Sequence, residues 1–210
     1  MNMNDFKDKV VLITGAGKGS GRLLAEAFAA RGAFVAANDI SPVNVDEVVA
    51  GIVSRGRKAK SYVDDVAKKI AVQTLVKQIE DDLGHIDILI NHAAVRPHVS
   101  LLDIDEWDWH RVLDVNLTGA LLMMQSVGRM MRAQGQGVII NLITGAGEGA
   151  DKESAYQASM AGLLVLTRSA ARELSPHGIR VNGLLDVRHD KVVDVVFDLC
   201  LSNANGKIVE

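Results

Sequence analysis

A glycine-rich turn between an apolar run and a helical segment constrains the fold of this chain more than any other feature. The turn reads TGAGKGSG over residues 14–21, and an amphipathic segment follows it over 22–30. Its glycines allow a tight turn and let a ligand approach backbone N–H groups closely, above all Gly15, Gly19 and Gly21. Because the next helix points the positive end of its dipole at that ligand, the turn predicts a strand–turn–helix unit that binds phosphate.

Short apolar runs and longer amphipathic segments alternate along the chain, which is typical of parallel strands joined by crossover helices. We predict strands over 10–13, 34–37, 60–63, 86–90, 138–142 and 179–184, and the start of a seventh at 207–209. We predict helices over 22–30, from Ser41-Pro42 onward, and over 68–83, 105–131 (with a kink allowed), 154–174 and 191–201. The strands are apolar almost throughout, so helices should cover both faces of the sheet. The fold class is therefore α/β, a doubly wound, Rossmann-like parallel sheet in one domain over residues 1–210.

Composition argues against several classes of protein. The net charge of −3 gives no reason to expect a nucleic acid or an anionic membrane as partner. The longest apolar stretches are too short to span a bilayer. A single cysteine, Cys200, allows neither an intrachain disulfide nor a cysteine zinc cluster, and we expect no metal site. No basic-then-apolar leader opens the sequence, so we expect a cytoplasmic protein.

Two helical segments, 117–131 and 155–170, have little polar face. A helix that is apolar all round must be covered on both sides, and one sheet face covers one side. We therefore expect a homo- or hetero-oligomer that pairs through these helices.

Asp39 closes the second predicted strand about 20 residues after the glycine-rich turn, where a carboxylate can bind ribose hydroxyls. The carboxylate would repel a 2′-phosphate and so favours NAD over NADP. Lys18 would instead favour NADP, because a cation in the turn could attract that phosphate. We give the carboxylate at the strand end more weight than the mobile lysine.

These motifs, in this order, resemble the short-chain dehydrogenase/reductase family almost from end to end. TGAGKGSG is similar to the family's TGxxxGxG loop, NHAA (91–94) to its Asn-Asn-Ala-Gly segment, DVNLTG (114–119) to the segment with a site asparagine, and IRVNG (179–183) to its sixth strand. His92 and Ala94 depart from the pattern. The resemblance implies a cofactor-binding set of Gly15, Lys18, Gly19, Ser20, Gly21, Asp39, Ile40, Asp65, Val66, Asn91 and Ala93, with Asp65 and Val66 at the adenine ring.

For some of these residues, a role within the fold is an alternative to contact with the cofactor. Asn91 could equally bridge groups within the sheet. Asp65 could be a surface turn residue, although the surrounding motifs favour the adenine role. We expect His92 to pack or hydrogen-bond beside the sheet, since the family gives it no catalytic role.

The resemblance also implies a catalytic group that this chain has altered. Tyr156 takes the place of the general acid or base, Thr144 that of the serine that polarises the reacting oxygen, and Asn116 that of the asparagine that supports a relay water. Threonine keeps the hydroxyl, although Thr144 could equally bond to local backbone. Four residues after the tyrosine the family has a lysine, which lowers the tyrosine pKa and binds the nicotinamide ribose; here the residue is Met160.

Methionine keeps the length and the apolar stem of lysine but carries no charge. We therefore expect turnover to be weak or absent, most of all where a tyrosinate must act as base. A protonated tyrosine could still donate its proton in ketone reduction. Lys152 could supply a cation, but we expect it to precede the helix.

The segment after the sixth predicted strand departs from the family as well. The family has Pro-Gly and then an insertion that covers the substrate, whereas LLDVRHDKVVDVVF (184–197) leads almost directly into the last helix. We expect no Pro-Gly to position the nicotinamide amide, no lid, and a last strand cut short at Glu210. We expect a flexible loop around Gly145, Gly147 and Gly149.

Three functions follow. The first is an NAD-linked dehydrogenase or reductase of a small hydroxy or keto compound, which the family makes the best class. The second is a non-catalytic subunit that pairs with an active homologue. The third is a nucleotide-binding or sensing protein that uses the adenosine half of the site. The intact dinucleotide motifs predict NAD binding, and the altered nicotinamide end predicts little or no turnover.

Overall fold

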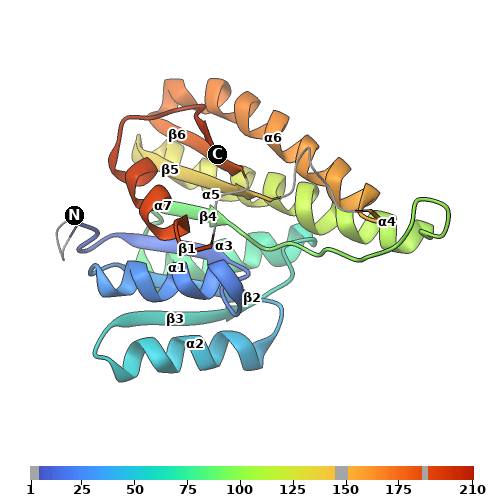
Figure 1. The fold of residues 1–210 in the computed structure, drawn as a ribbon. Helices are drawn as coiled ribbons and strands as arrows, with labels where there is room; N and C mark the ends of the chain where they lie inside the picture. Colours follow the sequence, from blue (N-terminus) through green and yellow to red (C-terminus); the bar gives the residue numbers. More distant parts are fainter. Residues whose placement is uncertain (1–4, 145–150, 186–188) are drawn as a thin grey trace.

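A seven-stranded parallel sheet forms the centre of the molecule (Figure 1). The computed structural model describes residues 5–144, 151–185 and 189–210. The strand order is β3-β2-β1-β4-β5-β6-β7. The strands are β1 (Val10–Thr14), β2 (Phe34–Asp39), β3 (Lys58–Val63), β4 (Ile88–Asn91), β5 (Gly137–Ile143), β6 (Ile179–Leu185) and β7 (Ile208–Val209). Since the order reverses between β1 and β4, the sheet is doubly wound, and the α/β fold predicted from the sequence is confirmed.

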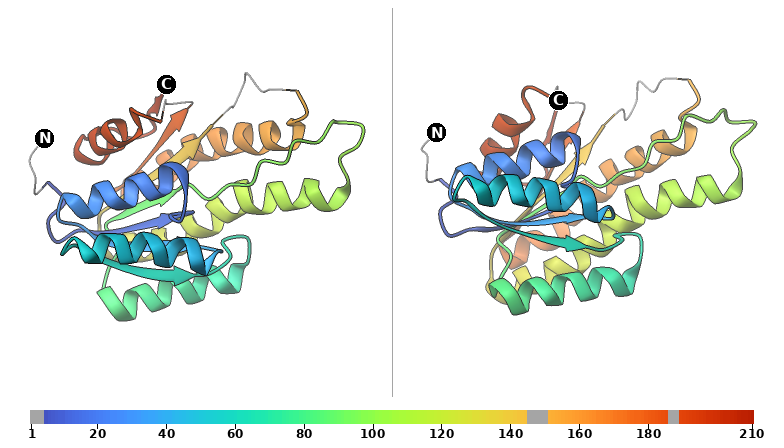
Figure 2. Two further views of the ribbon diagram at one scale, coloured as in Figure 1. Left: turned by 60° about the horizontal axis from the view of Figure 1, so that its bottom comes forward. Right: turned by 90° about the horizontal axis from the view of Figure 1, so that it is seen from below.

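Helices cover both faces of this sheet (Figure 2). One face packs against α1 (Gly19–Ala30), α2 (Pro42–Ser54) and α7 (Val192–Leu201). The other packs against α3 (Lys69–Leu83), α5 (Ala120–Gln134) and α6 (Ser154–Leu174). The remaining helical pieces are α4 (Glu106–Leu113), a π-helical segment Asp114–Gly119 and a 3₁₀ turn Ser175–His177.

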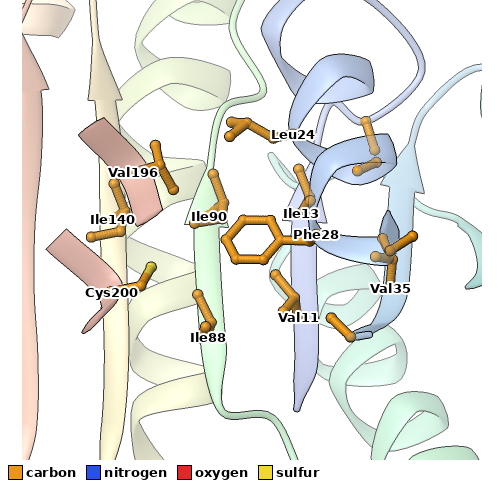
Figure 3. Close-up of a cluster of buried hydrophobic side chains, with 14 of the residues drawn as sticks. Val11, Ile13, Leu24, Phe28, Val35, Ile88, Ile90, Ile140, Val196 and Cys200 are labelled. Carbon is orange, nitrogen blue, oxygen red and sulfur yellow. The ribbon is translucent and has the colours of Figure 1, made fainter. Parts of the chain in front are cut away.

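The core on the α1 side is aliphatic around three phenylalanines. Phe6, Phe28 and Phe197 lie with ring centroids 4.8 Å apart in each pair, which joins the N-terminal segment, α1 and α7. Figure 3 shows Phe28 and Val196 lying over the strands in the same layer as Cys200. Burial raises the pKa of the Cys200 thiol to about 12, so this cysteine is a small apolar core residue at neutral pH.

The predicted elements agree with the structure to within a few residues. Ser41 caps α2 by accepting a hydrogen bond from Asn44 N at 3.4 Å, and Pro42 occupies the first turn, as the sequence predicts. The long run predicted over 105–131 is refined: α4 and α5 are joined by the π-helical segment 114–119. A π turn holds one more residue than an α turn, which hydrophobic periodicity does not reveal.

The two helical segments with little polar face are largely covered by the chain itself. Of the large hydrophobic side chains in 117–131 and 155–170, Leu121 and Val165 remain exposed, at 36% and 65%. Among the residues that the structure describes, no helix is both long and apolar enough to cross a membrane.

Candidate functional site

A cavity of about 500 Å³ opens at the carboxyl ends of β1 and β4, where the strand order reverses. Open α/β sheets bind ligands at this point, because the loops on the two sides diverge there. The cavity walls come from the glycine-rich turn, the ends of β2 and β3, the segment after β4, α4 and the end of β5. They include Gly15, Lys18, Ser20, Asp39, Ile40, Asp65, Val66, Ala93 and Thr144 from the set predicted by sequence.

Two glycines of the turn are required by close packing. Gly15 has φ +64°, and a Cβ there would lie 2.9 Å from the Cα of Ala93. At Gly21 a Cβ would lie 2.2 Å from the carbonyl oxygen of Gly15. The helix α1 then begins at Gly19 with no side chain of Lys18 capping its N-terminus. Its first backbone N–H groups are therefore available to an anion.

The Asp39 carboxylate joins this turn to the end of β2. One oxygen accepts a hydrogen bond from Gly17 N at 3.0 Å and the other from Ser41 N at 2.9 Å. Ile40, 66% exposed, follows on the same wall of the cavity. The negative charge thus sits beside the turn, in a geometry that two backbone donors fix.

The segment after β3 lies across the cavity. Asp65 and Val66 both line it. The Asp65 carboxylate also accepts a hydrogen bond from Ala67 N at 2.9 Å, so the side chain orders its own turn as well.

The segment after β4 lies close to the glycine-rich turn. Thr14 Oγ1 accepts hydrogen bonds from His92 N and Ala93 N, each at 3.1 Å. The imidazole Nδ1 of His92 lies 3.1 Å from the carbonyl oxygen of Gly15, and burial lowers the pKa of this histidine. His92 is therefore held neutral against the turn at neutral pH.

Asn91 lies inside the sheet and not on the cavity wall. Its amide donates to Asn141 Oδ1 at 2.8 Å, and Asn141 in turn donates to Thr167 Oγ1 at 2.9 Å. The side chain of Asn91 is thus used within the protein, in the arrangement that the sequence left open as the alternative to cofactor contact.

At the other end of the cavity the structure brings two predicted catalytic residues together. The hydroxyls of Thr144, just after β5, and Tyr156, in the first turn of α6, form a hydrogen bond. Tyr156 and Met160 are 2% and 1% exposed, and both belong to one apolar cluster with Ile143 and Leu163. One helical turn after Tyr156, the side chain of Met160 therefore packs among apolar residues.

Asn116 connects the segment after β4 to α6. Its Oδ1 accepts a hydrogen bond from Val95 N at 2.8 Å, and its Nδ2 donates to Val95 O and to Ser159 Oγ, each at 3.0 Å. The residue is 1% exposed in the π-helical segment. Its bonds position the wall of the cavity next to Tyr156.

A charged cluster beside Tyr156 was not predicted from the sequence. Arg96 donates from Nε and Nη2 to the two carboxylate oxygens of Glu153, at 2.9 and 2.7 Å, and His98 Nε2 lies 3.2 Å from the same carboxylate. The Arg96 guanidinium carbon lies 4.8 Å from the centroid of the Tyr156 ring. Hydrogen bonds from Arg96 lower the pKa of Glu153, whose side chain is 1% exposed. No local pattern links residues 57 positions apart, so sequence reasoning had no signal for this pair.

A second unpredicted contact joins the glycine-rich turn to the segment before α7. The Nδ1 of His189 lies 2.9 Å from Ser20 Oγ. The one available signal was the shortness of the segment between β6 and α7.

Lys152 lies ahead of α6, as predicted, and is exposed with φ +69°. The expectation of a flexible loop around Gly145, Gly147 and Gly149 lies outside the described residues. Within 5–144, 151–185 and 189–210, no group of three or more acidic, histidine or cysteine side chains could hold a metal ion.

Comparison with known proteins finds relatives across most of the chain. The family model described as short chain dehydrogenase matches residues 9–185. An uncharacterized oxidoreductase of Thermotoga maritima is 41% identical over 181 residues, covering 86% of this chain and 71% of that protein. A galactitol 2-dehydrogenase of Agrobacterium fabrum is 39% identical over 198 residues, covering 91% and 76%.

Solved structures give the same result for the fold. A crystal structure of NAD⁺-bound xylitol dehydrogenase matches with a TM-score of 0.92 and 27% identity, over 98% of each chain. A metagenomic short-chain oxidoreductase in complex with NADP matches with a TM-score of 0.92 and 26% identity, over 98% of this chain and 97% of that one.

Proposed function

Because this chain belongs to the short-chain dehydrogenase/reductase family of oxidoreductases, we propose that it binds NAD(H) and turns over a small hydroxy or keto substrate weakly or not at all. NAD(P) is the usual cofactor of this family, and the two structures just described contain NAD⁺ and NADP. For this chain we propose a preference for NAD over NADP and a low rate of turnover.

The Asp39 carboxylate supports the preference for NAD. Two backbone N–H groups hold it at the end of β2. An adenosine ribose bound as in the family would meet this carboxylate with its hydroxyls, which could donate hydrogen bonds to it. A 2′-phosphate would meet the same charge and be repelled, and Lys18 on the exposed turn offsets that repulsion incompletely.

The remaining cofactor contacts are proposed from the cavity walls. The first turn of α1, with Gly19, Ser20 and Gly21, would hold the pyrophosphate. Ile40, Asp65 and Val66 would hold the adenine, and Gly15 and Ala93 would lie along the nucleotide. Since Asn91 donates to Asn141, we propose that it supports the end of β4 and does not touch the cofactor.

Met160 is the observation that carries the proposal of weak turnover. When bound, the reduced cofactor supplies a hydride. The Tyr156 hydroxyl, hydrogen-bonded to Thr144, is placed to donate a proton to a substrate oxygen. No positive charge follows at position 160, where a methionine 1% exposed is packed in apolar surroundings. The step that needs an ionised tyrosine therefore lacks the cation that the family provides.

The cofactor proposal is tested by titrating the protein with NADH and with NADPH and following cofactor fluorescence. We expect saturable binding of NADH and weaker binding of NADPH. Asp39→Ala should reduce the difference in affinity between NADH and NADPH, because it removes the charge that repels the 2′-phosphate. Absence of saturable NADH binding at millimolar concentration would contradict the proposal.

The catalytic proposal is tested with Met160→Lys, assayed beside the parent on a panel of small ketones and polyols. We expect turnover to rise by about 10²- to 10⁴-fold, the range that a correctly ionised acid–base group contributes. Met160→Leu, which keeps the volume and adds no charge, is the matched control and should leave turnover at the parent level. A parent that already turns over at ordinary enzyme rates, about 1–10³ s⁻¹, would show that position 160 is not limiting.

A non-catalytic role is the second candidate, favoured by the contrast between the two ends of the cavity. The adenosine end keeps its glycines, Asp39 and Asp65, whereas the nicotinamide end has Met160 and a short segment after β6. Such a protein would sense a nucleotide or accompany an active homologue. Stable NADH binding without turnover in both the parent and Met160→Lys, or co-purification with a longer homologous chain, would favour it.

A further inference from the structure

A salt bridge joins the segment after β4 to the residue that precedes α6, directly beside Tyr156. Arg96 donates from Nε and Nη2 to the two carboxylate oxygens of Glu153, at 2.9 and 2.7 Å, and the Glu153 side chain is 1% exposed. The same guanidinium lies over the Tyr156 ring, with its central carbon 4.8 Å from the ring centroid. One arginine therefore contacts two side chains that lie three positions apart at the start of α6.

The backbone around Arg96 is held on both sides. The residue before it, Val95, shares two hydrogen bonds with the buried amide of Asn116, at 2.8 and 3.0 Å. Three residues after it, Val99 N donates to the carbonyl oxygen of Lys152 at 2.9 Å. Because the backbone is fixed at both points, the arginine side chain reaches the tyrosine ring from a defined position.

The other contacts of the Tyr156 ring are apolar. The ring is 2% exposed and belongs to a cluster with Ile143 and Met160. Apolar packing keeps water away but is non-directional, so it tolerates small rotations of the ring. A guanidinium that binds a carboxylate through two parallel hydrogen bonds and stacks on an aromatic face has a fixed plane. Arg96 therefore supplies the directional contact that the apolar cluster lacks.

We propose that Arg96 is a positioning residue for the proton donor. Paired with Glu153, it holds the Tyr156 ring so that the hydroxyl stays hydrogen-bonded to Thr144 and directed at the substrate oxygen. The proposal rests on the proton-donating role of Tyr156 proposed above. Arg96 acts through the ring and not on the substrate.

The first test measures the mobility of the ring in the parent chain and needs no turnover. The chain has two tyrosines, Tyr62 and Tyr156, so ¹³C-labelled tyrosine gives two sets of ring signals, which Tyr156→Phe assigns. In Arg96→Met we expect NMR relaxation to show a more mobile Tyr156 ring. Tyr62, whose hydroxyl donates to Asp82, should stay as in the parent and reports an intact fold. A shift of the Tyr156 signals without greater mobility would overturn the inference, because removal of any nearby charge shifts them.

Two further variants separate positioning from damage to the helix start. Arg96→Met leaves the buried Glu153 carboxylate unpaired, whereas the double variant Arg96→Met/Glu153→Gln does not, and it should show the same mobile Tyr156 ring. A ring that is mobile only in the single variant would contradict the role of Arg96. Arg55→Met is the matched control, because Arg55 pairs with Glu26 at the end of α2. It should leave the ring as in the parent.

The second test measures catalysis in the Met160→Lys chain, where we expect turnover. Adding Arg96→Met should lower kcat and kcat/KM equally, by about 10²-fold, because a misplaced group fails in the transition state and not in ground-state binding. Arg96→Lys should lose as much, since an ammonium keeps the charge but has no planar fork to bind the carboxylate and stack on the ring. Full kcat in Arg96→Lys would show that charge matters and position does not.

The two tests distinguish this inference from the function on which it rests. If Met160→Lys shows no turnover, the catalytic proposal fails, and the mobility of Tyr156 in the parent and in Arg96→Met decides alone whether Arg96 holds the ring. If Met160→Lys is active and Arg96→Met leaves its kcat unchanged, the role of Arg96 is wrong while the proposed function stands.

Discussion

At the scale of single residues, the hydroxyl of Tyr156 is hydrogen-bonded to Thr144, and the cation beside its ring is Arg96. Arg96 lies over the face of the tyrosine ring, and two of its donors bind Glu153. A guanidinium held in this way anchors the ring. It does not take the position one helical turn further on, from which the family's lysine reaches both the tyrosine and the cofactor ribose. We therefore expect turnover to depend on the residue at position 160.

The glycine-rich turn gives a residue-scale prediction. Gly21→Ala places a Cβ 2.2 Å from Gly15 O and 2.6 Å from His92 Nδ1, so the turn must shift. We expect a lower midpoint of thermal unfolding and loss of NADH binding. Gly51→Ala is the control, because Gly51 lies inside α2 and, apart from its own helix backbone, no group lies within 4 Å of the added Cβ. It should stabilise the protein by about 0.5–1 kcal/mol. Unchanged NADH affinity in Gly21→Ala would contradict the role of the turn.

The sequence predicted residues whose function depends on local pattern. Gly15 lies in the strand–turn–helix unit and Asp39 at the end of the next strand, and the structure places both on the wall of one cavity. It could not predict Arg96 or His189, because their partners are distant in the chain and meet through packing of the whole sheet. For Asn91, pattern alone left two roles open, and a partner on the neighbouring strand β5 decides how its amide is used.

At the scale of elements, the start of α6 depends on the segment after β4. Glu153 receives hydrogen bonds from Arg96, and the carbonyl of Lys152 accepts one from Val99 N at 2.9 Å. Figure 1 shows this segment running out beside the start of α6. Asn116 in the π-helical segment adds bonds to Val95 and Ser159. The segment after β4 and the π-helical segment thus fix the orientation of the helix that carries Tyr156.

Glu153 gives the prediction at this scale. Arg96 lowers its pKa below the ordinary 4.5, so the folded state favours the carboxylate. The stability from this pair is complete above pH 4.5 and is lost as the pH falls through the lowered folded pKa. Glu153→Gln should therefore unfold at lower urea concentration than the parent at pH 7, with the gap closing as the pH falls below 4.5.

Urea unfolding at several pH values measures this gap, with Glu106→Gln as the control because that side chain is 89% exposed. The control should follow the parent throughout. A gap in Glu153→Gln that stays constant down to pH 3 would show that the carboxylate contributes through its shape and not through its charge.

Helices were predictable because their buried positions repeat about every 3.6 residues, and strands because they form short, almost continuous apolar runs. The predicted range of α6 over 154–174 matches the structure. The π-helical segment 114–119 was not predictable, because it depends on Asn116 reaching Val95 and on close packing of Gly119 against Val66. These contacts are made with other elements, so they do not change the hydrophobic periodicity of the segment.

At the scale of the whole molecule, apolar surface remains on α5 and α6. Leu121 and Val165 are exposed, and we propose that a second subunit, either a copy or a homologue, covers these helices. Val165→Glu should weaken that association without affecting the fold, because the side chain is 65% exposed in the isolated chain.

Sedimentation velocity at micromolar concentration tests this proposal. We expect the parent to sediment as an oligomer and Val165→Glu as a smaller species. Val165→Thr, with nearly the same shape, should keep most of the association. A monomeric parent, or an unchanged Val165→Glu, would contradict pairing through these helices.

The doubly wound fold was predictable because a parallel sheet needs apolar strands joined by crossover helices. Both appear in the sequence as alternating short apolar runs and longer amphipathic segments. The shared core follows from it: Phe6, Phe28 and Phe197 bring the first and last parts of the chain together on one face.

Because Cys200 is buried in this core, its thiol can serve as a probe of local opening. The thiol lies 7% exposed under α7, and its raised pKa keeps it in the unreactive protonated form. A thiol reagent can modify it only while α7 is detached from the sheet, so the labelling rate at low reagent concentration measures how often that helix opens. Since His189 leads directly into α7, slower labelling in the presence of NADH would show that an occupied nucleotide site restrains the end of the fold.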